Sequence, residues 1–438
     1  MNASLSSRTS VHNSAYSVAE YITQPALMLL AAPFLVRKLG MDQYGLWMLV
    51  TAILGSMGLL SGGFGDATVR YVSSYRGRND LLGVERTIRA TLAVNGILGT
   101  LCGLLVWLAA PLGRSFFTIS QPLQTASIQA VRLSAIILLV RSMESVFVST
   151  LRAFERYGPP VAFNIALRIA VVCSAVMLAA LNYGVVAIMA ATLLWSVVVL
   201  LLQAVAARRV AGPFKVFPSF ARGPFAEVVR FGCFSWLQSL AGVSFSYADR
   251  FLVAAMLGTE QLGIYVLCVQ AAQTIHGLSA AAFNFVFPHI SSRYTGGNQQ
   301  ESGRVLRVSM LGSLGLSLGM ALVLIVFGKV VLSVWMGAAF AAHAYSVLAI
   351  LALAYFTLAL NVVPHYTLLA LGQVRFVSAV NIAGGVASLL AASALIPFFG
   401  VVGAALGRLL YGPTTALSFW RLNLEFKRVP LVKKPITV

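Results

Sequence analysis

The chain has 438 residues, of which 59% are hydrophobic and 10% are charged, and its formal net charge is +19. A soluble domain carries roughly 25% charged residues, so the composition excludes a soluble enzyme with a large core and predicts an integral membrane protein. The basic excess does not by itself indicate nucleic-acid binding, because membrane orientation concentrates Lys and Arg on one side. We therefore expect no nucleic-acid partner.

Apolar stretches long enough to cross the hydrocarbon core as helices recur from end to end of the chain. They predict an all-α integral membrane fold with twelve transmembrane helices in two pseudo-symmetric six-helix lobes around a central cavity. The first six spans are predicted at 18–38, 44–68, 88–111, 123–150, 160–181 and 185–207. The second six are predicted at 229–257, 264–290, 306–328, 341–370, 376–397 and 400–420.

The predicted spans divide the chain into four parts. They are an N-terminal six-helix lobe at 1–207, a cytoplasmic linker at 208–228, a C-terminal six-helix lobe at 229–421 and a basic cytoplasmic tail at 422–438. Phe and basic side chains in the linker suit either a segment lying on the anionic inner leaflet or a plain solvated connection. Residues 1–19 lack the pattern of a removable signal peptide.

Prolines inside the predicted spans indicate where helices bend. Pro25 and Pro33 fall in the first span and Pro364 falls in the tenth. Because proline removes one backbone hydrogen bond, each of these helices is predicted to be kinked.

A short phrase occurs twice, 218 positions apart. Residues 39–47 read LGMDQYGLW and residues 257–265 read LGTEQLGIY, each between two long apolar runs. Since each repeat unit contains six predicted spans, an even number, both units insert the same way up and are related by an axis along the membrane normal. This organisation is typical of transporters that rock one half against the other.

The basic residues of the predicted loops set the orientation. One side carries 22 Lys and Arg residues and the other carries four. Basic loops stay on the cytoplasmic side. We therefore predict a multi-pass membrane protein with both termini in the cytoplasm.

Charged residues inside predicted spans are the candidates for function, because charges in a bilayer are costly and usually functional. Arg141, Arg168, Arg250 and Arg408 are predicted to bind an anionic substrate, since guanidinium matches phosphate geometrically. For Arg250 the alternative is an arginine that snorkels to the outer surface.

Three carboxylates accompany these cations. Glu144 and Asp249 are the candidates for ion coupling, although Glu144 and Arg141, three residues apart on one helix face, are also placed to neutralise each other. Asp66 and Arg70 are spaced as an i,i+4 pair at a helix end, which we interpret as structural.

The remaining residue types give no support for catalysis. The four cysteines fall inside apolar runs, and the histidines are scattered without metal-ligand spacing. His365, next to Pro364, is the best of them for a proton relay. We expect no enzyme activity, no metal site and no cofactor.

With these residues considered, the chain resembles the polysaccharide transporter (O-antigen flippase) family of the multidrug/oligosaccharidyl-lipid/polysaccharide exporter superfamily. The resemblance covers nearly the whole chain. It depends on residues 36–47 (VRKLGMDQYGLW), on Gly63-Phe64-Gly65-Asp66 with Val69-Arg70-Tyr71, and on Asp249-Arg250-Phe251 before Leu257-Gly258. No cargo-binding residue of the family can be matched here.

The resemblance implies translocation of an undecaprenyl-pyrophosphate-linked glycan across the bacterial inner membrane by alternating access, for O-antigen, capsule or exopolysaccharide biosynthesis. It also implies contact with membrane lipid, coupling to H+ or Na+, and a polysaccharide polymerase or chain-length regulator as a possible partner. An ion-coupled multidrug antiporter has the same fold, but cationic drugs favour a carboxylate-rich cavity. A peptidoglycan-precursor flippase and a membrane glycan polymerase or ligase are further alternatives.

Overall fold

We describe the protein from a computed structural model, which covers residues 23, 25–212, 217–283, 286, 287, 290 and 299–428. Nearly all of these residues are helical, and no β-strand occurs among them. The contacts divide the chain into two compact units, Met1–Leu267 and Cys268–Val438. The lobe and linker boundaries predicted from the sequence stay a prediction.

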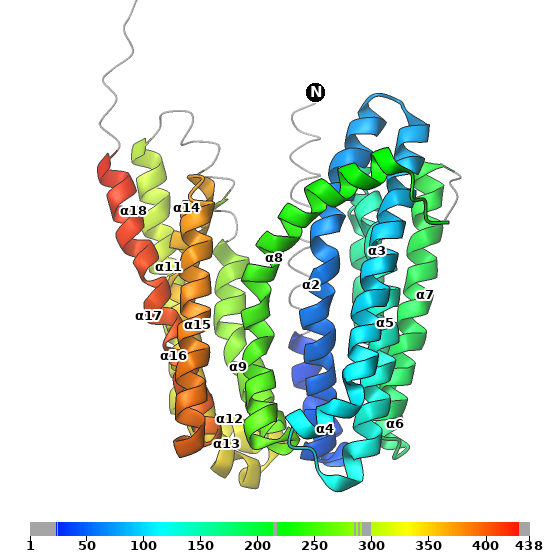
Figure 1. Cartoon of the computed structure of the whole chain (residues 1–438). Helices are drawn as coiled ribbons and strands as arrows, with labels where there is room; N and C mark the ends of the chain where they lie inside the picture. The colour runs from blue at the N-terminus through cyan, green and yellow to red at the C-terminus, as the bar shows by residue number, and fades with distance from the viewer. Residues whose placement is uncertain are drawn as a thin grey trace, which may run out of the picture. The chain divides into compact units, whose positions relative to one another are not determined.

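The first unit consists of long helices joined by short connections (Figure 1). Residues 25–39 are helical. The helices that follow are α2 (Met41–Gly77), α3 (Leu81–Ala109), η1 (Ala110–Leu112), α4 (Gly113–Phe116), η2 (Gln121–Leu123), α5 (Gln124–Ala153), α6 (Gly158–Ala180), α7 (Val185–Ala211), α8 (Arg222–Leu257) and the first part of α9 (Thr259–Phe283).

The second unit continues α9 and has more interrupted helices. They are α11 (Gln299–Val326), α12 (Gly328–Met336), α13 (Ala338–Leu360), α14 (Val362–Ala370), α15 (Val374–Phe399), α16 (Val401–Leu409), α17 (Tyr411–Thr415) and α18 (Leu417–Arg428). The tenth predicted span is divided at Asn361, three residues before Pro364, which confirms a break at this place. The twelfth predicted span is also divided, at Leu410 and Ala416, with Pro413 between them.

Seven helical stretches among the described residues are long and apolar enough to cross a membrane. They are Leu81–Leu112, Gly158–Ala180, Val185–Ala211, Thr259–Phe283, Gly303–Val326, Ala338–Ala370 and Val374–Phe399. The long helices α2 and α5 are not among the seven, and both carry charged residues along their length, including Asp66 on α2 and Arg141 on α5. The protein is therefore a multi-pass helical membrane protein, and α2 and α5 carry charged residues within their length.

Small and hydroxylated side chains hold α2, α3 and α5 together. A Cβ on Gly99 of α3 would lie 2.9 Å from the Cβ of Ser142 on α5, so the two backbones approach closely. The Ser142 hydroxyl donates to the Asn95 carbonyl at 2.8 Å, and the Thr68 hydroxyl donates to Thr91 at 3.0 Å. These buried contacts fix the face that α5 presents to the interior of the first unit.

The repeated phrase begins with the same backbone feature in both copies. Gly40 has φ 81° before α2, and Gly258 has φ 89° before α9. Glycine adopts this left-handed conformation without steric cost, whereas most side chains avoid it. The sequence match between the two copies therefore extends to backbone conformation.

Candidate functional site

A cavity of about 490 Å³ lies inside the first unit. Its size is typical of small-molecule sites. Its lining comes from helix 25–39 and from α2, α5, α6, α7 and α8. The polar and charged lining residues are Thr51, Asp66, Arg141, Glu144, Ser145, Ser149, Arg152, Asn164, Arg168, Thr192 and Tyr247.

Helix α5 supplies the largest share of this lining, with the spacing of a single helix face. Residues 137, 138, 141, 144, 145, 148, 149 and 152 all line the cavity. Side chains three and four positions apart lie one above the other on a helix. Arg141, Glu144 and Arg152 therefore share one stripe, and Asn164 and Arg168 do the same on α6.

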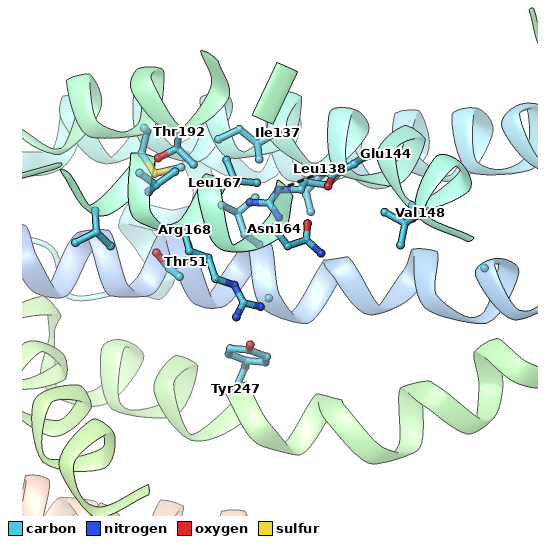
Figure 2. Close-up of a pocket in the computed structure, with 18 of the residues that line it drawn as sticks. Thr51, Ile137, Leu138, Glu144, Val148, Asn164, Leu167, Arg168, Thr192 and Tyr247 are labelled. Carbon is cyan, nitrogen blue, oxygen red and sulfur yellow. Dashed lines mark ion pairs between the residues drawn. The ribbon is translucent and has the colours of Figure 1, made fainter. Parts of the chain in front are cut away.

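Two of the four predicted substrate-binding arginines line this cavity together. Arg141 is partly exposed, and its Nε lies 4.0 Å from Oε2 of Glu144. Figure 2 shows Arg168 extending from α6 toward Tyr247 of α8. With Arg152, which lies two residues beyond the predicted span 123–150, the cavity holds three arginines and two carboxylates, Asp66 and Glu144.

Glu144 is buried, with a side chain 5% exposed. The amide Nε2 of Gln203 on α7 donates to its Oε1 at 2.9 Å. The sequence did not single out Gln203, since an uncharged residue deep in an apolar helix gives no charge signal. Only the packing of α7 on α5 brings the amide to the carboxyl group.

Tyr247 enters the cavity because α2 has no side chain opposite it. A Cβ on Gly55 would overlap the Tyr247 ring. The guanidinium of Arg250 lies 5.1 Å from the centroid of the same ring, a cation–π distance. Arg250 therefore contacts a residue that lines the cavity, but it does not line the cavity itself.

Asp249, the other predicted coupling residue, is held elsewhere. It is buried, accepts from the Tyr265 hydroxyl at 2.8 Å and accepts from the Arg250 backbone N–H at 2.9 Å. Arg408 lies in the second unit, 5.0 Å from the Tyr355 ring centroid. Its assignment as a substrate ligand stays a prediction.

Asp66 and Arg70 were predicted to form a structural pair. Asp66 lines the cavity. The Arg70 guanidinium lies 5.8 Å from the ring centroid of Tyr71. The predicted pairing stays untested, but Asp66 is placed among the cavity arginines.

No group of His, Cys, Asp and Glu residues suited to a metal ion occurs within the part of the chain that the structure describes. His289 lies outside the described residues.

The fold and this cavity define a helical multi-pass membrane protein with a charged cavity inside its first unit. The chain covers 100% of an inward-facing multidrug-resistance MATE transporter of the MOP superfamily, with TM-score 0.78 and 16% identity over 94% of this chain. It also matches the lipid II flippase MurJ in an inward closed conformation, with TM-score 0.74 and 12% identity over 96% of this chain and 88% of that one. At these identities the likeness shows the fold alone.

A family model described as "Polysaccharide biosynthesis protein" matches residues 10–293, and the chain belongs to this family. It is 22% identical to a "Putative O-antigen transporter" of Shigella flexneri over 90% of this chain and 93% of that protein. It is 25% identical to a "Probable low-salt glycan biosynthesis flippase Agl15" of Haloferax volcanii over 65% of this chain and 57% of that protein. These relatives are named as transporters, in agreement with the expectation of a non-enzyme at that coarse level.

Proposed function

We propose that this protein flips a polyprenyl-pyrophosphate-linked oligosaccharide repeat unit across the bacterial inner membrane by alternating access. The product would serve surface polysaccharide biosynthesis: O-antigen, capsule or exopolysaccharide. The observation that carries this proposal is the placing of Arg141, Arg152 and Arg168 around one cavity within the first unit. The relatives in Shigella flexneri and Haloferax volcanii, named as an O-antigen transporter and a glycan biosynthesis flippase, support the same cargo class.

The chemistry of the cargo explains the need for arginines. Moving a charged group out of water costs several kcal/mol per ion even after relaxation. Guanidinium groups offset that cost and bind phosphate oxygens through paired N–H donors. In this proposal Arg141 and Arg168, which line the cavity, would bind the pyrophosphate, and Asn164 and Ser145 would offer hydrogen bonds to a sugar.

The composition of the cavity favours this cargo over a cationic drug. Three arginines outnumber Asp66 and Glu144, so the lining has a formal charge of +1 with both acids ionised. A multidrug antiporter of the same fold would gain from the opposite balance. We also propose that both termini lie in the cytoplasm and that transport is coupled to an ion gradient. A polysaccharide polymerase or a chain-length regulator would be the partner protein.

The test is export in cells that depend on this gene. Arg141→Gln and Arg168→Gln should each lower surface polysaccharide and cause lipid-linked oligosaccharide to accumulate on the inner leaflet. Arg132→Gln is the matched control, because Arg132 lies on the same helix as Arg141 but against the Trp107 ring, 5.2 Å from its centroid, outside the cavity lining.

Two results would contradict the proposal. One is normal polymer output from an Arg141→Gln, Arg168→Gln double variant that is present in the membrane at the normal level. The other is loss of tolerance to cationic drugs on deletion, with surface polysaccharide unchanged, which would favour the antiporter.

A further inference from the structure

The carboxyl group of Glu144 lies between two different partners. Gln203 Nε2 donates to Oε1 at 2.9 Å, while Arg141 Nε stays 4.0 Å from Oε2, beyond hydrogen-bond distance. Oε2 of Glu144 and Oε1 of Gln203 are both buried, and neither has a hydrogen-bond partner within the described structure. Two buried acceptor oxygens of one carboxyl–amide pair therefore lack a hydrogen-bond donor within the described structure.

Buried polar atoms nearly always find a partner, and leaving one without costs about 1–3 kcal/mol. A single proton removes both deficits. Bound to Oε2 of Glu144, it gives that oxygen an O–H donor, and the Oε1 of Gln203 is the acceptor available on the same amide. The acid and the amide would then be joined by two hydrogen bonds in place of one.

Resting on the proposed function, we propose that Glu144 and Gln203 form a proton site that controls Arg141. With the proton bound on Oε2, Glu144 is neutral, pairs with Gln203 and leaves Arg141 for a phosphate group. When the proton leaves to water in the cavity, the carboxylate regains its charge and attracts Arg141. Proton binding and anion binding therefore favour each other.

The surrounding groups fit a proton better than a sodium ion. Na+ is held by several oxygen atoms, as other hard cations are. Here one carboxyl oxygen faces the Gln203 N–H group and the other faces a guanidinium, both of which would repel a metal cation. A proton needs a single acceptor.

Four other charged groups share the cavity with Glu144, and their formal charges sum to +2. They are Asp66 on α2, Arg141 and Arg152 on α5, and Arg168 on α6. On α3, which packs against the same stretch of α5, the contact with Ser142 is made by neutral Asn95. Ionised Glu144 lowers the formal charge of the lining to +1, and its protonation raises that charge to +2, so an anion is held more tightly.

The experiment uses the full chain in lipid nanodiscs and a prenyl-pyrophosphate-linked monosaccharide, whose diester phosphates do not titrate near neutral pH. Calorimetry would measure the affinity of this analogue at a series of pH values. Repeating the titration in buffers of different ionisation enthalpy gives the number of protons taken up on binding. We expect affinity to fall about tenfold as pH rises, within the range typical of coupled sites, and uptake of part of a proton at intermediate pH.

Glu144→Gln mimics the protonated acid, so it should keep the high affinity of acidic pH at every pH and take up no proton. Glu155→Gln is the matched control, because Glu155 is 79% exposed and pairs with Arg76; it should keep the normal pH dependence. Unchanged pH dependence in Glu144→Gln would overturn the proposal. So would an affinity that follows Na+ concentration at constant pH.

Infrared difference spectra separate this proposal from the proposed function. A protonated Glu144 gives a carboxylic C=O stretching band at acidic pH. Loss of this band in Glu144→Gln and a shift of it in Gln203→Leu would support the proton site. The band can be measured even if the analogue fails to bind at any pH. Absence of binding at every pH would count against the proposed cargo instead. Absence of the band at acidic pH would overturn the proton site.

Discussion

Gly45 lies against the backbone of Thr259 so closely that a Cβ atom on Gly45 would overlap the Thr259 carbonyl oxygen. The relationship is reciprocal within the repeat. Gly263, the counterpart of Gly45, would bring a Cβ atom within 2.9 Å of the carbonyl oxygen of Met41, the counterpart of Thr259. The two copies of the repeated phrase therefore pack on each other through equivalent glycines, and the Thr259 hydroxyl also donates to Asp42 of the first copy.

Gly45→Ala should destabilise the protein, because the methyl group meets backbone that cannot rotate away. Overpacking of this kind costs about 1–3 kcal/mol. The midpoint of thermal unfolding in detergent should fall. Gly319→Ala is the control, since Gly319 lies inside α11 with open space around its Cβ position, and it should leave the midpoint unchanged or slightly raised. Equal midpoints for the two variants would refute the close contact.

Gly55→Ala should lower export while leaving the fold intact. The added methyl group meets the ring of Tyr247, which is the movable end of a side chain, so the cavity changes shape before the helices do. Export should recover in part when Tyr247→Ala is added, because the clash is then removed. Additive losses in the double variant would show that Gly55 acts independently of Tyr247.

Arg89 should anchor the connection that leads into α8. Its Nε donates to the Phe217 carbonyl at 3.0 Å, and its own carbonyl accepts from the Ser219 N–H at 3.0 Å. Arg89→Ala removes the first bond, worth about 0.5–1.5 kcal/mol. Amide hydrogen exchange at Ser219 should rise up to about tenfold, and Arg86→Ala should not change it. Unaltered exchange in Arg89→Ala would contradict this anchoring.

Arg408 and Tyr355 should be energetically coupled in the second unit. Their cation–π contact of 5.0 Å involves a Tyr355 side chain that is almost fully buried. A double-mutant cycle with Arg408→Gln and Tyr355→Leu, measured by chemical unfolding, should give a coupling of about 1–2 kcal/mol. A coupling near zero would show that Arg408 is held by other contacts.

The helices were predictable because bilayer thickness requires long apolar runs, and each predicted span overlaps a helix wherever the structure describes it. The interruptions within these helices were harder to predict. Pro364 marked one of them, but the division of 400–420 into α16, α17 and α18 carries a weaker signal, with Gly412 and Pro413 in the short middle segment.

The site was predictable in part, for a related reason. Charges inside an apolar span stand out, so the sequence alone predicts Arg141, Glu144 and Arg168 as candidate site residues, and all three line the cavity. Arg152 lies just beyond the predicted span 123–150, although α5 and its cavity-lining stripe extend to it. Gln203 and Tyr247 come from helices α7 and α8, and only tertiary packing shows that they meet α5 and α6.

The hydrogen bonds from Ser142 to Asn95 and from Thr68 to Thr91 have a mechanical consequence. They cross-link α5 to α3 and α3 to α2 inside an apolar environment, where exchange for water is slow and costly. We expect these three helices to travel as one block, carrying Asp66 and Arg141 at a fixed separation. Access to the cargo would then change through displacement of α6, α7 or α8, while the α2–α3–α5 block moves as a rigid body.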